Sequence, residues 1–159
     1  MIRIKTLREY TEALLQRIPA IRSATLVNVD KDMSDALRQM KVREFPALFV
    51  VVPSADDDSA YPDNVAEVSQ CLLFLLDRSD HQRRTPLQVL EETQEVVETL
   101  KQQLREDACQ PCHFMSGLGN LSTNPETGLY SDYCGWSVSF NLSERKLPGY
   151  DRYQRNQNL

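Results

Sequence analysis

The stretch Pro46-Ala-Leu-Phe-Val-Val-Val-Pro53 predicts the central element of the fold. Its apolar residues stand between two prolines, which lack an amide hydrogen and commonly mark the ends of strands. The run is too short for a typical helix, and phenylalanine and valine favour the extended conformation. Because the run does not alternate with polar residues, both of its faces should be covered. We therefore predict a strand in the middle of a sheet, with helices packed on it.

The length of the chain predicts one domain that needs no disulfide or metal to fold. The chain has 159 residues, and a chain of this length buries on the order of 70% of its unfolded surface. The net charge of −5 and the pI of 5.1 argue against a dedicated nucleic-acid-binding surface. We find no signal-peptide core, and no apolar run reaches the roughly 18 residues of a membrane span. We expect a cytoplasmic protein with reduced cysteines.

Hydrophobic periodicity predicts the elements on either side of the central strand. A helix with one apolar face covers residues 7–18, and Thr6 and Glu9 form a capping box at its start. A strand over 23–29 and a short helix over 33–40 follow. After the central strand we predict a polar loop over 54–64. A second apolar strand over 67–77 should pair with the central strand as an antiparallel hairpin.

The best helix signals in the sequence begin at Thr85. Thr85 can cap the helix, Pro86 suits the first helical position, and Gln88 completes a capping box. The predicted buried stripe consists of Leu87, Leu90, Val97, Leu100 and Leu104, widened by Val89 and Val96. After this helix we predict strands over 114–121 and 135–142, separated by an extended loop over 122–132.

These elements predict an α/β (α+β) fold with helices packed on a mixed, mostly antiparallel sheet of about five strands. One long amphipathic helix covers residues 86–107. We expect a single domain over residues 1–142. A polar, basic tail over 143–159 should contact neighbouring subunits.

The sequence Cys109-Gln-Pro-Cys112-His113 matches the C-x-x-C-H pattern of haem attachment. A haem site is disfavoured because the chain shows no export signal and the motif follows a long helix. A redox-active pair needs its first cysteine at a helix N-terminus, where the dipole lowers the thiol pKa. This pair follows a helix C-terminus, where the dipole has the opposite effect.

Zinc is the more serious alternative for these residues. Cys109, Cys112 and His113, together with Cys134 or His81, would supply four nitrogen and sulfur ligands. Only Cys109 and Cys112 have the spacing of zinc ligands, and no second pair completes the pattern. In the simpler interpretation the cysteines behave as small apolar residues. We therefore expect neither a metal nor another cofactor.

No other pattern indicates a catalytic or calcium-binding site. The acidic run Asp56-Asp57-Asp58, with Asp63, lacks the glycine and the final glutamate of an EF-hand loop. We expect a solvated loop or an acidic contact with a partner. Neither histidine, His81 or His113, stands near a recognisable nucleophile motif. We therefore expect a protein without enzymatic activity.

The order of the predicted elements resembles the tail terminator family of long-tailed bacteriophages and similar small proteins of the neck and tail-completion group. That order is a helix, a strand, a connecting segment, the strand Pro46–Pro53, a polar loop, a long apolar strand, a long amphipathic helix and two terminal strands. The second terminal strand ends in Gly135-Trp-Ser-Val-Ser-Phe-Asn-Leu142. The resemblance covers about residues 7–142 and rests on order and size. The cysteine-rich helix end and the basic tail depart from the family pattern.

The resemblance implies a ring, typically hexameric, that caps the finished tail tube and stops its polymerisation. The ring would also form the surface on which the head connector docks. The implied partners are other copies of the chain, the tail tube and the neck or connector proteins, with the sheath as a further candidate. The implied location is the tail-neck region of the virion, assembled in the host cytoplasm and without membrane contact. The family has no catalytic residues to carry over.

Subunits of such a ring meet through heterologous interfaces that close by rotation. We expect these contacts in the loops 54–64 and 122–132 and in the tail after Ser143. The candidate contact residues are Asp56, Asp57, Asp58, Tyr61, Tyr130, Tyr133, Arg145, Lys146, Tyr150, Arg152, Tyr153 and Arg155. Asp56 to Asp58 and the glutamate-rich helix should make the lumen acidic, so that DNA passes without specific binding. The alternatives are a small zinc-stabilised module and a cytoplasmic adaptor without catalytic activity.

Overall fold

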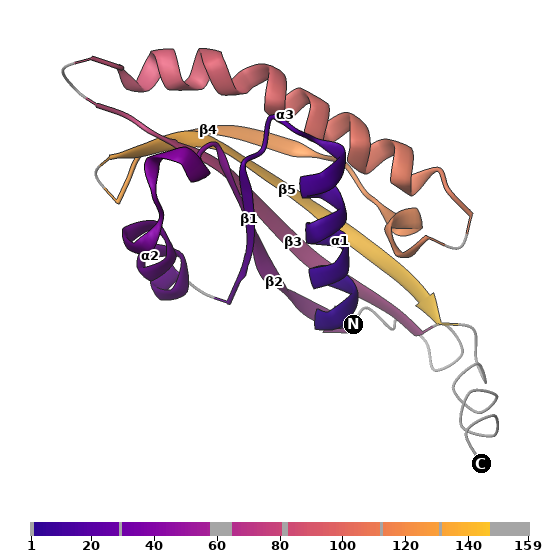
Figure 1. Ribbon diagram of the computed structural model, residues 1–159. Coiled ribbons are helices and arrows are strands. Elements are labelled where there is room, and N and C mark those ends of the chain that lie inside the picture. The colour runs from indigo at the N-terminus through magenta and orange to yellow at the C-terminus, as the bar shows by residue number, and fades with distance from the viewer. Residues whose placement is uncertain are drawn as a thin grey trace.

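The computed structural model describes residues 2–28, 30–57, 65–80, 83–111, 113–130 and 132–146. Within these ranges the chain forms an α+β fold with a mixed five-stranded sheet and three α-helices (Figure 1). The helices are α1 (Ile4–Arg17), α2 (Asp30–Gln39) and α3 (Pro86–Ala108). The strands are β1 (Ser23–Val27), β2 (Ala47–Asp57), β3 (Val65–Arg78), β4 (Ser122–Leu129) and β5 (Tyr133–Lys146). Two 3-10 turns are η1 (Val42–Glu44) and η2 (Phe114–Gly117).

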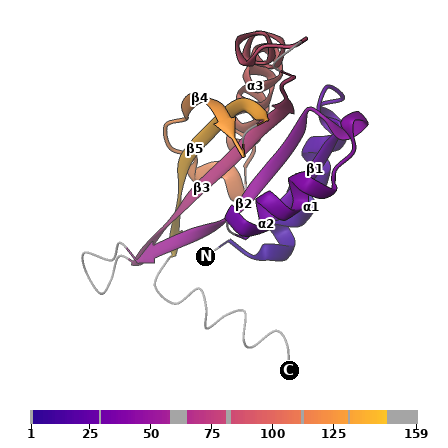
Figure 2. The ribbon, with the colours of Figure 1, turned by 90° about the vertical axis from the view of Figure 1, so that its left-hand side faces the viewer.

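The sheet has the strand order β1-β2-β3-β5-β4. Strands β1 and β2 are parallel, and the other neighbouring pairs are antiparallel. The predicted hairpin of β2 and β3 is confirmed, with Ala47 opposite Leu76 and Val51 opposite Leu72. Figure 2 shows α1 and α2 beside β1 and β2, whereas α3 lies beside β4 and β5.

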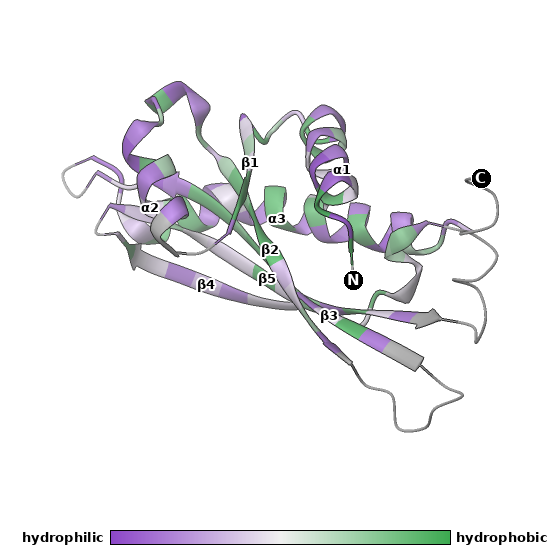
Figure 3. Cartoon of the chain, turned by 90° about the horizontal axis from the view of Figure 1, so that it is seen from below, coloured by the Kyte–Doolittle hydropathy of each residue, from purple (hydrophilic) through white to green (hydrophobic). Residues whose placement is uncertain are grey.

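Strand β2 is covered on both faces along its first half, as its unbroken apolar run predicts. Leu48 and Val50 belong to the larger core, which α1 and α3 complete. Ala47 and Phe49 point the other way, into a smaller core that includes Met33 of α2 and its neighbour Leu37. Full burial of one such large side chain contributes about 1.5–3 kcal/mol. In Figure 3 β2 is predominantly hydrophobic, whereas β4 is hydrophilic along much of its length.

The start of α3 confirms the predicted capping box. The Gln88 amide donates to Thr85 Oγ1 (3.3 Å), and the Thr85 amide donates to Gln88 Oε1 (2.8 Å). The buried stripe begins at Val89 and includes Val97. The prediction that Leu87 is buried is wrong, because its exposed fraction is 64%. Two residues correspond to about 200° around a helix, so Leu87 faces nearly opposite to Val89.

The start of α1 differs from the predicted one. The helix begins at Ile4 with Arg3 at the N-cap, and no side chain caps it. Thr6 therefore lies inside the first turn, and the predicted capping box of Thr6 and Glu9 is wrong. Local capping residues were outweighed by burial, since Ile2 and Leu7 both anchor this end in the larger core.

Three segments that lack an apolar pattern are strands, not loops. The predicted loop over 54–64 is β-strand as far as Asp57, and the predicted loop over 122–132 contains β4. The first four residues of the predicted tail, 143–146, continue β5. Each segment is held by hydrogen bonding to a neighbouring strand, which outweighs its polar composition.

The predicted strand over 114–121 is also wrong. Residues 114–117 form η2, and His113 Nδ1 caps it by accepting from the Met115 amide (3.2 Å). The chain must turn here from the end of α3 into β4. Met115 is buried in the larger core, which explains the apolar character of the segment without a strand.

Candidate interaction surface

Strands β2, β3 and β5 extend past the two outer strands and form one end of the molecule (Figure 1). Strand β1 ends at Val27, opposite Val51 of β2, and β4 begins at Ser122, opposite Ser139 of β5. We call the three-stranded part beyond these points, residues 54–57, 65–70 and 141–146, the projecting end. One extra residue of β2 between Val51 and Ser54 forms a bulge where the projecting end begins.

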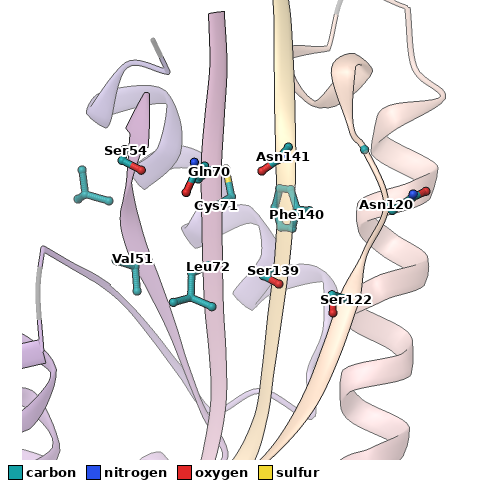
Figure 4. Close-up of a pocket in the computed structure, with 12 residues that line it drawn as sticks. Val51, Ser54, Gln70, Cys71, Leu72, Asn120, Ser122, Ser139, Phe140 and Asn141 are labelled. Carbon is teal, nitrogen blue, oxygen red and sulfur yellow. The ribbon is translucent and has the colours of Figure 1, made fainter. Parts of the chain in front are cut away.

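A shallow depression of about 680 Å³ lies on the sheet where the projecting end begins (Figure 4). It includes Ser54, Gln70, Leu72, Ser139 and Asn141 from three neighbouring strands. These residues alternate with those that α1 and α3 cover, so they belong to the opposite face of the sheet. None of its described lining residues is charged.

The projecting end brings together acidic and basic candidates from distant parts of the sequence. Asp56 is exposed and accepts a hydrogen bond from the Gln70 side-chain amide (3.0 Å). Asp57 is the last residue of β2, and Arg145 and Lys146 are the last two residues of β5. The candidates Asp58, Tyr61, Tyr150, Arg152, Tyr153 and Arg155 lie outside the described residues.

Two tyrosine candidates lie at the opposite end of the sheet. Tyr133 pairs with Arg78, and its hydroxyl donates to the carbonyl oxygen of Leu37 (3.1 Å). Its ring stacks on Phe45 with 5.5 Å between the ring centroids. Tyr130 is exposed and has a positive φ of 51° in the turn before β5. The hydroxyl of Tyr133 thus attaches the end of α2 to the sheet.

The zinc candidates are not all brought together. Cys109 follows the C-terminus of α3, and His113 lies a few residues further on. Cys134 is buried beside Ser79 (Sγ to Oγ 3.8 Å), near the start of α3. The helix has 23 residues, which span roughly 35 Å at 1.5 Å per residue. Cys112 and His81 lie outside the described residues, and within the described part no three potential ligands cluster.

A buried ionic network joins α1 to the end of α3. Asp107 has an exposed fraction of 1%. Its carboxylate accepts from the Tyr10 hydroxyl (2.6 Å), from Arg17 Nη1 (2.7 Å) and from Gln103 Nε2 (3.2 Å). Sequence reasoning missed this network, because Asp107 reads as one more polar residue at a helix end. The only signal was that Tyr10 interrupts an otherwise aliphatic helix face.

The network shifts the pKa values of its members in opposite directions. Burial, then the bond to Asp107, raises the pKa of Tyr10 well above its ordinary value. Burial alone would raise the pKa of Asp107, but hydrogen bonds from Arg17 and Tyr10 outweigh it and lower that pKa. Asp107 therefore stays ionised at neutral pH, and the network stabilises the packing of α1 on α3.

A second polar cluster fixes the connection between β3 and α3. Arg84 Nη2 donates to Asp77 Oδ2 (2.9 Å) and also contacts the Glu92 carboxylate. The hydrogen bond to Asp77 is the main cause of the raised pKa of Arg84. Arg84 and Asp77 line a cleft of about 810 Å³ with Val42 and Phe45. The carboxylates of Asp77 and Glu92 therefore hold the Arg84 guanidinium in place. No ligand is needed to explain its position.

Comparison of the sequence with the profiles of known protein families finds no match, and a comparison with curated proteins finds none either. In the part of the chain that the structure describes, no helix has the length and apolar character of a membrane span. The fold and the projecting end are therefore the observations from which a function can be argued.

Proposed function

We propose that the protein is a non-catalytic structural subunit of a long-tailed phage particle that acts as a tail terminator. Copies of the chain would form a ring, typically hexameric, on the finished tail tube. The ring would stop tube polymerisation and provide the surface on which the head connector docks. Its place would be the tail-neck region of the virion, after assembly in the host cytoplasm.

The observation that carries this proposal is the order of the elements, α1-β1-α2-β2-β3-α3-β4-β5. It is the order on which the resemblance to tail terminators rests. The five-stranded sheet supports the same proposal, because α1 and α3 cover one face, whereas α2 covers only part of the other and leaves polar residues exposed there. A ring subunit needs surface of this kind for contacts with neighbours above, below and beside it.

Charge supports the passage of DNA through such a ring. The net charge is −5, and the exposed side of α3 carries Glu91, Glu95 and Glu98. Asp56 adds an exposed carboxylate at the projecting end. DNA binding needs clustered lysine and arginine residues that replace counterions on the phosphates. An acidic lumen would repel the phosphates and let DNA pass without adhering.

The test has two stages, assembly and capping. Native mass spectrometry of the purified protein should show a hexamer of the 18.3 kDa subunit, with a denatured spectrum recorded alongside. The protein is then added to growing tubes of the tail tube subunit from the same phage, and tube lengths are measured by electron microscopy. We expect the added protein to cap tube ends and arrest their growth.

Two outcomes would contradict the proposal. Tubes that grow equally with and without the protein, and whose ends carry no added density, would exclude a terminator role. A monomer that carries one metal-sized adduct would instead favour the zinc-stabilised module, and a chelator should then lower its melting temperature.

A further inference from the structure

We propose that copies of this chain join edge to edge at their projecting ends. The outer edge of β2 at residues 54–57 of one copy pairs, in parallel, with the outer edge of β5 at residues 144–146 of the next. This inference deepens the proposed function, because it names the surface that would build the ring. It needs only a second copy of the chain, so it can be tested without any other tail protein.

The outer edge of β2 at the projecting end has no partner strand among the described residues. Strand β1 pairs with β2 only as far as Val51, and no other described strand pairs beyond that point. Beyond the bulge, β2 therefore continues as an edge strand. An edge strand presents a row of main-chain donors and acceptors and is a template for pairing with another chain.

The outer edge of β5 is also uncovered by any described strand near its end. Strand β4 stops at Ser122, and the segment before it contacts β5 through the Gly119 amide, which donates to the Asn141 carbonyl oxygen (2.8 Å). Leu118 adds an isolated bridge to Leu142, and Gly117 packs closely against the Ser143 carbonyl. The chain leaves β5 here, so residues 144–146 have no described strand on that side.

The register shows which main-chain groups point outward. The Asn141 carbonyl points away from β3, and main-chain groups alternate along an antiparallel strand, so those of Arg145 also point outward. Gln70 is the partner of Asn141 on β3. Its main-chain N–H and C=O groups must then point towards Ser54 of β2. By the same alternation, the main-chain groups of Ala55 point away from β3. Both edges thus offer main-chain donors and acceptors that point away from β3 and that no described strand uses.

The charges on the two edges favour pairing of β2 with β5 over pairing of two like edges. The β2 edge carries the two negative charges of Asp56 and Asp57. The β5 edge carries Glu144 followed by Arg145 and Lys146 and so has one net positive charge. A twofold dimer would place like edges together, aspartate against aspartate or arginine against arginine, and like charges on adjacent strands are destabilising. Pairing β2 with β5 joins opposite charges. That contact is heterologous, and a heterologous contact that closes by rotation produces a ring.

The strand directions fit the same arrangement. Strands β2 and β5 are each antiparallel to β3, so they run parallel to one another. Rotation about a ring axis would bring β5 of one copy alongside β2 of the next in the same direction. The sheet also narrows from five strands to three at the projecting end, so neither β1 nor β4 lies beside the two edges there. The sheet also has outer edges at β1 and β4. The edge of β4 carries Pro125, which cannot donate a hydrogen bond and protects that edge.

The experiment blocks each edge without breaking the ladder inside the subunit. Ala55→Pro removes an outward amide of β2, and Arg145→Pro removes one of β5, while both leave the hydrogen bonds to β3 in place. Thr127→Pro, in the outer strand β4, is the matched control. Native mass spectrometry measures assembly, and circular dichroism with a melting curve verifies that each variant is folded.

We expect wild type and Thr127→Pro to form rings and each edge variant to be a monomer. An equimolar mixture of Ala55→Pro and Arg145→Pro should give one-to-one dimers that do not grow, because one intact edge of each kind remains. Charge reversal is the second test, in case a proline variant does not fold. Asp56→Lys with Asp57→Lys, or Arg145→Glu with Lys146→Glu, should abolish the ring, and all four substitutions together should restore it.

Two results would overturn the inference, and they differ in what they say about the proposed function. Rings that persist in both proline variants and in both charge reversals would exclude edge pairing but leave a ring-forming terminator intact. A wild-type protein that is monomeric at every concentration, and stays so on tail tubes, would overturn both. Rings that depend on both edges but leave tube growth unchanged would support the edge pairing and contradict the terminator role.

Discussion

Substitution of Asp107 by asparagine tests the buried network that joins α1 to α3. Asp107→Asn keeps the shape of the side chain but removes its charge and places an amide donor where three donors, from Tyr10, Arg17 and Gln103, already converge. At least one of these donors then loses its acceptor. Tyr10 is affected more, because its ring is buried in the larger core and its hydroxyl cannot turn to bulk solvent.

The expected loss in the free energy of unfolding follows from the three hydrogen bonds that Asp107 accepts. Hydrogen bonds to a charged group contribute about 1.5–3 kcal/mol each, and an unsatisfied buried donor costs about 1–3 kcal/mol. The side chain of Arg17 is 35% exposed, so water competes for its hydrogen bonds. The contribution of the Arg17–Asp107 pair to stability is therefore smaller than that of a buried pair. We therefore expect a loss of about 3 kcal/mol in the free energy of unfolding. For a domain of this size that corresponds to a melting temperature lower by roughly 6–12 °C.

The pH dependence identifies the charge as the cause. In the folded protein the pKa of Asp107 is lowered, so its contribution is present above the unfolded pKa of about 3.9. That contribution is lost as the pH falls through the lower, folded-state pKa. Urea unfolding of both proteins from pH 7 downwards should show the full difference above about pH 5 and a decreasing difference in more acidic solution.

Glu98→Gln is the matched control on the same helix. Glu98 pairs with Lys101 (2.9 Å), but its side chain is 57% exposed, so we expect a change of less than about 0.5 kcal/mol. The reasoning would be refuted if Asp107→Asn were as mild as Glu98→Gln. It would also be refuted if the difference from wild type were the same at pH 3.5 and pH 7.

Further predictions concern the capping box, a close approach, an unpaired hydroxyl and metal binding. Thr85→Ala should cost about 1 kcal/mol in urea unfolding, because it removes the cap of α3. Gly135→Ala should prevent stable folding, seen as loss of the cooperative melting transition, because its methyl group would overlap the Leu75 carbonyl oxygen. Ser69→Ala should raise the free energy of unfolding by about 1 kcal/mol, since the buried Ser69 hydroxyl has no hydrogen-bond partner in the described structure. As a control, Ser116→Ala at an exposed position should change the free energy of unfolding by less than about 0.5 kcal/mol. A chelator should leave the melting temperature unchanged, because α3 separates Cys134 from Cys109.

The parts of the fold that were predictable from sequence are those in which local and tertiary preferences agree. The run Ala47–Val52 is apolar on both faces because both faces are covered along most of its length. The cap at Thr85 forms where the sequence places it, because both of its hydrogen bonds join residues only three positions apart. In both cases the local structure follows from residues that are close together in the sequence.

The remaining parts depend on residues distant in sequence. Strand β4 contains Pro125 and Gly128 and has no apolar pattern, yet pairing with β5 makes it a strand. Tyr10 and Asp107 are 97 residues apart, so no local pattern indicates their hydrogen bond. The candidates Asp56 and Arg145 were predictable as exposed charges. Their position at one end of the sheet required the register of β2, β3 and β5.

The outermost part of the projecting end, residues 54–57, 65–68 and 143–146, lies outside the interior of the protein. None of its described residues belongs to either hydrophobic core. Substitutions there would leave folding nearly unaffected, since most loss of stability comes from disturbed cores and buried polar groups. Selection for stability and selection for partner choice would thus act on separate residues. Such a subunit can acquire a new neighbour by exchanging a few charges, while the scaffold that presents them stays the same.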